Sequence, residues 1–551
     1  MPNPPVALPT WVQSVVDLYN SQAHNQFILT GNVNDRFGSG IEPGAGGCSL
    51  AEYLQQTVVP RYEVVLRYDL GNGLRIDRGG QIFSQWPGAE TPPRNARPAI
   101  EFITAYLRYC ANLAGLGQTR VKVAVILNDA DLFMHGDDRG AEANAAAFLV
   151  REWSRDPGLT RHDLVSFILA ENLTELHPLV RQNTQAARVE IPLPTPPEIE
   201  LWLAQSRGAG ALALAELGSD LGSVAEALSG TTLNALDRMV RLADHRKLPL
   251  KAEELGRFKA EIIERECPGL VEFLPPKLTL NNLHGQEALK THLRQNLALW
   301  QARRLDLIPQ GYLLCGPVGT GKTYVVKCLA GEAGVPVVVL KNFRDKWFGS
   351  TEGNLEKIFR TLRALGRCCV FIDEADQSLG KRDPGGTEPG VSGRIYAMFA
   401  QEMSDPANRG RILWILATSR PDLVEVDLKR PGRIDVKIPL FPTATSEESW
   451  AMIRGVGKGR GVELPENPPE TWATKVPDLM TAGEIDALLT QIQREAVAGK
   501  TSLLDALGRR FTHYLRPVGE AVLWEQTRLA VAECSDADFI PERFRAIGMA
   551  K

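Results

Sequence analysis

The sequence predicts an α/β fold that is built twice along the chain, each copy made of a parallel-sheet domain followed by a small helical domain. Short apolar runs typical of buried strands alternate with helix-like segments in both halves of the chain. Such alternation favours a parallel sheet whose two faces are covered by helices. Blocks of sequence from the first half also recur, in the same order, in the second half.

In the first half, segments rich in β-branched and other apolar residues predict the strands of one sheet, at 27–30, 62–68, 121–127, 165–169 and 189–193. Stretches rich in glycine and proline at 38–48 and 86–98 predict loops or an insertion on that sheet. We therefore assign residues 1–195 to a first α/β domain.

From residue 196 to residue 266 the pattern is helical throughout, which predicts a small helical domain. Its apolar faces are supplied by Leu201, Leu212, Leu214, Leu217, Leu221, Leu228, Leu233, Leu236, Val240 and Leu242. The prolines that follow, Pro268, Pro275 and Pro276, stop any helix and mark a boundary, so we expect a linker at 267–280.

The second half repeats this plan. Three blocks correspond in order, 371–376 with 126–131, 415–422 with 168–175, and 436–440 with 189–193. A chance similarity would not sustain both order and spacing, so we infer a tandem duplication. The second α/β domain is expected at 281–442. Helices in 443–551 are expected to complete a second helical domain and to dock on it.

A glycine-rich loop is the main functional feature of the second copy. Residues 316–323, GPVGTGKT, lie between an apolar strand-like run and a helical run. Glycines free the backbone to turn its N–H groups onto phosphate oxygens, Lys322 can reach the outer phosphates, and the Thr323 hydroxyl can bind Mg²⁺. We expect a nucleotide to be bound by Gly316, Pro317, Val318, Gly319, Thr320, Gly321, Lys322, Thr323 and Tyr324.

The first copy differs at the corresponding loop. Residues 31–36, GNVNDR, keep the first glycine but lack the later glycines and the lysine. We therefore expect the first copy not to hydrolyse nucleotide.

Two carboxylates follow a buried strand-like run of the second copy. The run at 368–372 ends in Asp373 and Glu374, which suits Asp373 for the Mg²⁺ shell and Glu374 for the attacking water. The alternative, a carboxylate pair that caps the next helix, is disfavoured by the glycine-rich loop upstream.

Composition and charge exclude some classes of protein. A net charge of -4 and a pI near 6.2 do not indicate the basic surface that binds nucleic acid. The start of the chain lacks a basic region followed by an apolar core, and no apolar run approaches the roughly 18 residues of a membrane span. We expect a cytoplasmic protein, and no disulfides among its 8 cysteines.

Several spaced motifs of residues 277–500 resemble those of AAA+ ATPases of the AAA subfamily. They include the Walker A loop at 316–323, the Walker B carboxylates, residues 417–422, residues 430–433 and residues 481–486. The resemblance implies an ATP- and Mg²⁺-dependent, ring-forming remodeller of proteins, expected to be a hexamer. The first half looks like a degenerate copy of the same module, as in some poorly characterised bacterial and plastid double-AAA proteins.

The resemblance also implies roles for individual residues. Arg430 and Arg433 match the arginine-finger segment that serves a neighbouring subunit's γ-phosphate. Gly483 matches the start of the lid helix behind the nucleotide, while His284 and Gly285 match the turn that packs against adenine.

One position departs from the family pattern. Ser419 stands where the family usually has Asn, and its single hydroxyl is shorter than an amide. We therefore expect either that ATP turnover is slow or that Thr418 helps in place of the missing amide.

Residues Lys346, Trp347, Phe348 and Gly349 resemble the first pore loop, in which an aromatic side chain grips an extended polypeptide. The alternative is an aromatic pair packed in the core. Arg394 is either a contact between subunits or a solvated charge on a helix.

Three functional classes remain. The leading one is an ATP-driven remodeller of an unidentified protein client. The second is an assembly factor or nucleotide switch that does not thread its client. A nucleic-acid motor or loader is disfavoured by the net charge.

Overall fold

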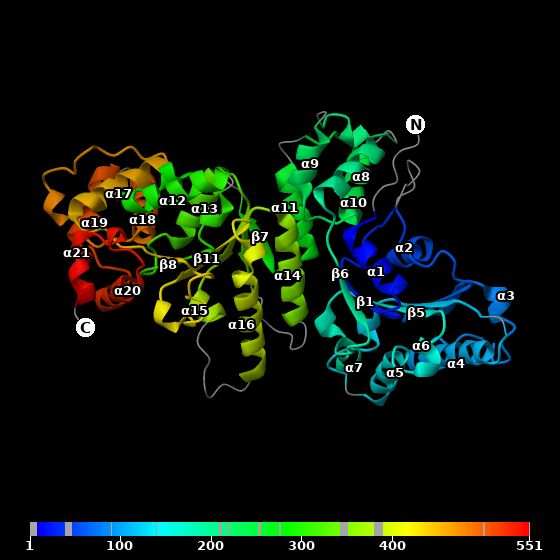
Figure 1. Ribbon diagram of the computed structural model, residues 1–551. Coiled ribbons are helices and arrows are strands. Elements are labelled where there is room, and N and C mark those ends of the chain that lie inside the picture. Colours follow the sequence, from blue (N-terminus) through cyan, green and yellow to red (C-terminus); the bar gives the residue numbers. More distant parts are fainter. Residues whose placement is uncertain are drawn as a thin grey trace. The chain divides into compact units, whose positions relative to one another are not determined.

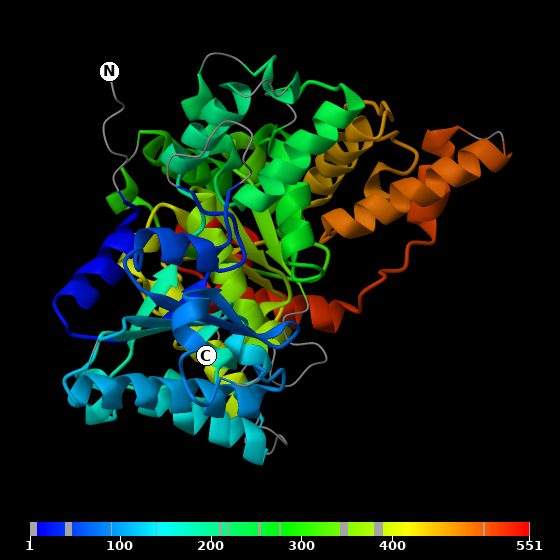
Figure 2. The same ribbon diagram turned by 90° about the vertical axis from the view of Figure 1, so that its right-hand side faces the viewer.

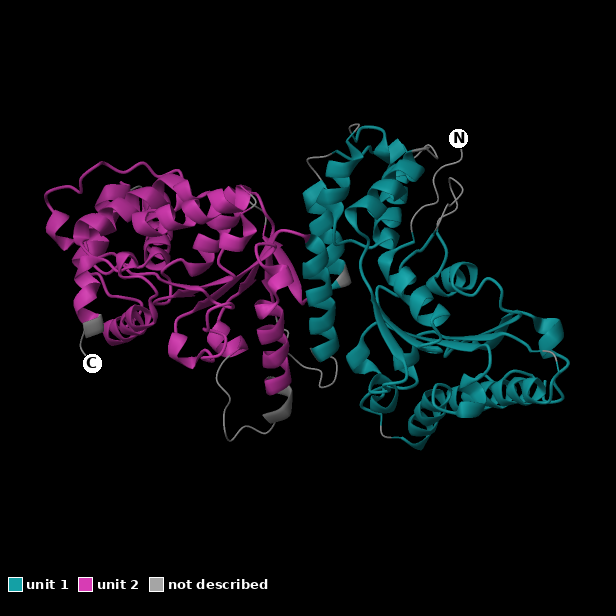
Figure 3. Ribbon diagram, in the orientation of Figure 1, with its two compact units in different colours: residues 1–267, 345–365 teal, residues 268–344, 366–551 magenta. Residues whose placement is uncertain are grey.

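A computed structural model describes residues 8–38, 47–89, 91–118, 120–138, 140–208, 212–217, 220–251, 255–274, 277–302, 304–341, 351–379, 389–499 and 502–549. The chain forms two compact units (Figure 3). The first unit comprises residues 1–267 with 345–365, and the second comprises residues 268–344 with 366–551. The expected two-copy α/β fold is confirmed, because each unit contains a six-stranded sheet with helices around it.

The sheet of the first unit has the strand order β3-β2-β4-β5-β1-β6. Its strands are β1 (Gln26–Gly31), β2 (Val64–Asp69), β3 (Gly73–Arg78), β4 (Val123–Leu127), β5 (Leu164–Ala170) and β6 (Ala187–Ile191). All pairs are parallel except β2 with β3. The edge strand β3 was not predicted. It returns through a tight turn in which the Asn72 backbone N–H donates to Asp69 Oδ1 at 2.7 Å.

Helices cover both faces of this sheet, as Figures 1 and 2 show. One face packs α1 (Thr10–Asn20) and α2 (Leu50–Thr57), and the other packs α4 (Ala96–Gly115) and α5 (Ala141–Glu152). Strand β1 serves both cores, since Phe27 and Leu29 belong to the first and Ile28 to the second. Three short helices complete the layers, α3 (Gly80–Phe83), α6 (Pro157–Thr160) and α7 (Pro178–Arg181).

A helical bundle follows in the first unit, made of α8 (Pro196–Gly208), α9 (Leu221–Leu228), α10 (Leu233–Arg246) and α11 (Leu255–Glu266). Its core holds most of the apolar residues predicted for it. Leu201, Leu212 and Leu242 are exceptions and are exposed. Helix α14 (Thr351–Leu365) is grouped with this unit.

The sheet of the second unit has the order β12-β8-β11-β10-β9-β7. Its strands are β7 (Val271–Leu274), β8 (Gly311–Cys315), β9 (Val337–Leu340), β10 (Cys368–Ile372), β11 (Ile412–Thr418) and β12 (Val436–Pro439). The five parallel strands follow the same order as in the first sheet, and both sheets end in one antiparallel edge strand. Strand β7 comes from the segment expected to be a linker.

The remaining helices of the second unit fall into three groups. Around the sheet lie α12 (Glu287–Gln301), α13 (Lys322–Ala333), α15 (Ala375–Ser378) and α16 (Pro389–Ser404). A helical domain contains α17 (Ser446–Gly459), α18 (Ala482–Gly499) and α19 (Leu503–Thr512) around a shared core. The last helices are α20 (Glu520–Glu533) and α21 (Glu542–Arg545).

Helix α20 does more than dock on this helical domain, because its end is fixed to strand β12. The Glu533 carboxylate pairs with Lys437 of β12 and with Lys429, both at 2.8 Å.

Across the described ranges, none of the helices has both the length and the hydropathy needed to cross a membrane.

Candidate active site

The glycine-rich loop joins the end of β8 to the start of α13. Gly316, Gly319 and Gly321 have φ values of 152°, 84° and 89°, which side chains rarely adopt. A Cβ at Gly316 would collide with the Leu440 carbonyl, and one at Gly319 would lie 2.8 Å from Thr481 Oγ1. The backbone conformation therefore favours glycine at all three positions, and close packing adds to this at Gly316 and Gly319.

Lys322 lies at the first position of α13 and points back over this loop. Its ammonium group donates to the carbonyl oxygens of Gly316 and Pro317, at 2.8 and 3.0 Å. Burial lowers the pKa of Lys322, and the Asp373 carboxylate partly opposes that shift. A partly buried ammonium at a helix N-terminus is suited to exchange these neutral acceptors for anionic phosphate oxygens.

Thr323 and Asp373 bring two hard oxygen ligands together. Thr323 Oγ1 donates to Asp373 Oδ2 at 2.9 Å, and the Glu374 backbone N–H donates to Asp373 Oδ1 at 3.0 Å. This pair fits Mg²⁺, which binds through few protein oxygens and completes its shell with water and phosphate. The described residues contain no cluster of three or more His, Cys, Asp or Glu that could hold a metal.

Glu374 follows at the carboxyl edge of the sheet, exposed to solvent. Its φ of 48° is left-handed, a conformation that costs about 1–3 kcal/mol outside glycine. Asp129, at the corresponding place after β4 of the first unit, has the same conformation with φ of 46°. The turn is therefore a shared feature of the two units. No hydrogen bond or ion pair with another described residue engages the Glu374 carboxylate.

The end of β11 supplies the next polar groups. The Thr418 hydroxyl is buried, donates to the Asp376 carboxylate and accepts from the Arg420 backbone N–H at 2.8 Å. Ser419 comes next and is half-buried. The Thr418 hydroxyl already donates one hydrogen bond and accepts another. Of these two hydroxyls, Ser419 is therefore the better placed to bind a further group.

The helical domain touches the glycine-rich loop at the start of α18. The Gly483 backbone N–H donates to the Gly319 carbonyl at 2.8 Å, and a Cβ at Gly483 would lie 3.2 Å from Gly319 Cα. Thr481 and Glu484 cap this helix reciprocally, with distances of 2.8 and 3.3 Å. Two glycines therefore allow the backbones of loop and helical domain to meet.

His284 and Gly285 form a turn before α12, where Gly285 has φ of 71°. The His284 ring packs so tightly on Gly455 of α17 that a Cβ there would collide with it. Burial lowers the pKa of His284, which keeps the imidazole neutral near pH 7. Tyr324, partly exposed, donates from its hydroxyl to the Asn282 carbonyl at 3.3 Å.

Gln526 is a further residue at this site that sequence reasoning missed. It lies on α20, is nearly buried, and accepts from the Val318 backbone N–H of the loop at 3.1 Å. The helical pattern of α20 contains no signal for this contact, because it depends on how α20 lies against the sheet.

Arg430 and Arg433 lie at the opposite end of the sheet from the loop. They precede β12, whose neighbour β8 begins at Gly311, and the Asp435 backbone N–H donates to the Gly311 carbonyl at 3.0 Å. A five-residue strand spans roughly 16 Å. Arg430 is 68% exposed and pairs with Asp427 at 2.8 Å, and Arg433 donates to the Asp427 carbonyl at 2.9 Å. Neither arginine therefore reaches its own loop.

Residues Lys346, Trp347, Phe348 and Gly349, expected to form a pore loop, lie outside the described residues. Arg394 is an exposed residue of α16.

In the first unit, the loop after β1 binds the unit's own helical bundle. The buried Asp35 carboxylate accepts from the backbone N–H groups of Leu233 and Asn234, at 3.0 and 2.8 Å, in the first turn of α10. Asn32 donates to the same carboxylate at 2.9 Å, and Arg36 pairs with Asp237 at 3.3 Å. A protein carboxylate thus takes the place at a helix N-terminus that suits an anion.

Comparison with known families agrees with this two-part organisation. Residues 2–192 match the family described as AAA+ chaperone, N-terminal Rossmann-like domain. Residues 312–441 match the ATPase family associated with various cellular activities (AAA).

Similar curated proteins include "Protein SAV" of Sulfolobus acidocaldarius, 32% identical over 179 residues, which are 31% of this chain and 23% of that protein. "Peroxisomal ATPase pex6" of Schizosaccharomyces pombe is 29% identical over 43% of this chain and 26% of its own length. "ATP-dependent zinc metalloprotease FtsH" of Rhodococcus erythropolis is 30% identical over 46% of this chain and 30% of its own length. The chain thus covers less than a third of each of these relatives.

Proposed function

The chain is an AAA+ protein with an AAA+ chaperone N-terminal domain ahead of an AAA domain, and we propose that it hydrolyses ATP to remodel a protein client. The observation that carries the proposal is the Thr323–Asp373 pair beside a loop of glycines with positive φ. This arrangement supports the proposal because the two oxygen groups that would hold Mg²⁺ lie next to the loop that would bind the phosphates.

Each residue of the site has a chemical task. The N–H groups of the loop and the Lys322 ammonium bind the phosphates, while Thr323 and Asp373 hold Mg²⁺. When bound, the ion neutralises charge on the phosphate oxygens. Glu374 orients the attacking water and takes its proton, help worth about 10² to 10⁴ in rate. Ser419 would stand beside the outer phosphate in the role for which the family usually has Asn.

The proposed active form is a ring, expected to be a hexamer. Arg430 and Arg433 lie at the other end of the sheet from their own loop, so they would stabilise the γ-phosphate of a neighbouring subunit. Arginine fingers of this kind are worth about 10³ to 10⁵ in rate in other phosphate-loop enzymes. In such a ring Trp347 would grip an extended client, a role that rests on the resemblance of residues 346–349 to a pore loop.

The second candidate function is an assembly factor or nucleotide switch that acts without threading. The first-unit loop favours it, because Asp35 joins that loop to the helical bundle of the same unit without a nucleotide.

The proposed location is the cytoplasm. A nucleic-acid motor is the least favoured class, given the net charge of -4.

The experiment that separates these functions is ATPase stimulation of the full chain. A permanently unfolded protein, double-stranded DNA and buffer alone are compared at equal ionic strength. The remodeller hypothesis expects stimulation by unfolded protein only. Stimulation by DNA would favour a nucleic-acid motor. An ATPase that neither probe changes would favour the switch.

A further inference from the structure

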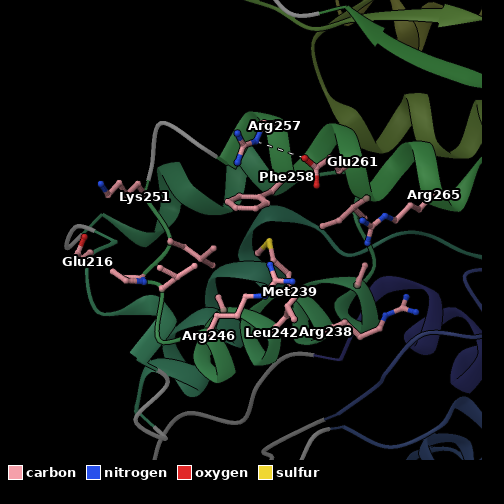
Figure 4. A pocket seen from close by; sticks show the side chains of 16 residues that line it. Glu216, Arg238, Met239, Leu242, Arg246, Lys251, Arg257, Phe258, Glu261 and Arg265 are labelled. Atoms are coloured by element: carbon pink, nitrogen blue, oxygen red, sulfur yellow. Dashed lines mark ion pairs between the residues drawn. The ribbon is translucent and has the colours of Figure 1, made fainter.

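An open groove runs along the helical bundle of the first unit, between α10 and α11. Its volume is about 860 Å³, and its floor is apolar, made by Met239, Leu242, Leu248, Phe258 and Ile262. Figure 4 shows Phe258 of α11 and Met239 of α10 pointing toward one another across it. Leu242 and Leu248 are 49% and 60% exposed, although periodicity had predicted Leu242 on a buried face. The groove thus offers apolar anchor points to a partner.

The edge of the groove is basic. It carries Arg238, Arg246, Lys251, Arg257 and Arg265, against two acidic residues, Glu216 and Glu261. The Glu261 carboxylate forms an ion pair with Arg257 at 3.7 Å. No carboxylate of the described residues pairs with Arg246, Lys251 or Arg265. Among the described residues that line the groove, positive charges therefore outnumber negative ones, in a chain whose net charge is -4.

We propose that this groove binds an acidic amphipathic helix of a partner protein. A helix of three to four turns laid along α10, which itself spans 14 residues, would run about 20 Å. Its apolar face would cover Leu242, Leu248 and Phe258, and flanking Asp and Glu side chains would meet the basic edge. In this mode of recognition, apolar residues at positions i, i+3, i+4 and i+7 of the bound helix insert into the groove.

The chemistry of the groove disfavours other occupants. A small ligand is normally oriented by polar groups that converge on its pocket, whereas here the charged groups lie around the edge and the floor is apolar. A nucleic acid would meet the positive edge but leave the exposed leucines uncovered. The proposal does not depend on ATP hydrolysis, because the groove is built entirely from the first unit.

The test is a selection from a displayed library of helical 16-residue peptides against the immobilised full chain, followed by fluorescence anisotropy with synthetic copies of the selected peptides. The selected sequences should have one apolar face and net negative charge. Their affinity should fall at least tenfold with Leu242→Glu and with Arg246→Glu, and should weaken as salt is raised.

Leu201→Glu is the matched control, because Leu201 is an exposed leucine of the same bundle that lies outside the groove. It should leave the affinity unchanged, and circular dichroism should show that all variants are folded. Hydrogen exchange should slow in α10 and α11 when peptide binds.

Three results would overturn the proposal. The first is that no peptide is selected. The second is that the selected peptides are basic or bind Leu242→Glu as well as the parent. The third is that Leu242→Glu reduces the oligomeric mass in light scattering while peptide does not compete, since the groove would then be an interface between copies of this chain.

Discussion

Thr323 donates a 2.9 Å hydrogen bond to the Asp373 carboxylate, which joins the first turn of α13 to the end of strand β10. Residues 50 positions apart in the chain thus meet because β10 and β8 are both parallel strands of one sheet, with β11 between them. The carboxyl ends of these strands bring together the loop, the proposed metal ligands and the proposed general base.

The Lys322→Ala variant should lose ATP binding, and Glu374→Gln should bind ATP but hydrolyse it at least about a hundredfold more slowly. The lysine charge belongs to the phosphate cradle, whereas the glutamate acts on the water. Isothermal titration calorimetry and phosphate release measure the two properties separately. Parent-rate hydrolysis by Glu374→Gln would remove Glu374 from its proposed role.

One nucleotide should bind per chain, in the AAA domain. The first-unit loop lacks a lysine, and Asp35 already occupies the N-terminus of α10. Native mass spectrometry of the parent chain should show one ATP per subunit, and Lys322→Ala should show none. A second ATP that survives Lys322→Ala would mean that the first unit binds nucleotide after all.

Asp35→Ala should loosen the bond between the first-unit loop and its helical bundle. The variant removes the acceptor for two backbone N–H groups at the start of α10, a loss typically worth about 0.5–2 kcal/mol for a helix cap. Hydrogen exchange in residues 31–36 and at the start of α10 should speed up. Asp220→Ala is the matched control. Asp220 caps α9 of the same bundle, so its loss should leave exchange in residues 31–36 unchanged.

Trp347→Ala should keep the basal ATPase near the parent value and lose the stimulation by unfolded protein. The indole is proposed to touch the client rather than the phosphates. Circular dichroism and ATP titration accompany the assay. A variant that unfolds or no longer binds ATP would mean that the tryptophan is part of the core, and the switch would become the leading function.

Much of the fold follows from local sequence signals. Central strands such as β4, β5, β10 and β11 are nearly continuous apolar runs, and the glycine-rich loop indicates the strand before it and the helix after it. The edge strands β3 and β7 were missed because they are only half-buried, so their sequences, GLRIDR and VEFL, lack that continuous apolar character. Only their pairing with a neighbouring strand identifies them.

The contacts that could not be predicted depend on how elements pack. Gln526 reaches the loop because α20 lies along β12, and nothing in the helical pattern of residues 520–533 indicates that placement. Leu242 has the spacing of a core residue, yet it lies on the rim of the apolar face of α10, where the bundle does not cover it. Helical periodicity indicates which face is apolar but not how much of it the neighbours bury.

The most direct test of a shared, ring-dependent ATPase site is to mix two inactive variants. Arg430→Ala lacks the finger but keeps the loop, and Lys322→Ala lacks the loop's lysine but keeps the finger. Neither should hydrolyse ATP alone, and mixing them should restore part of the activity, because some interfaces then pair an intact loop with an intact arginine. Mixtures that stay inactive although native mass spectrometry shows mixed rings, or an Arg430→Ala chain that hydrolyses ATP at the parent rate, would contradict the proposed action of Arg430 on a neighbour.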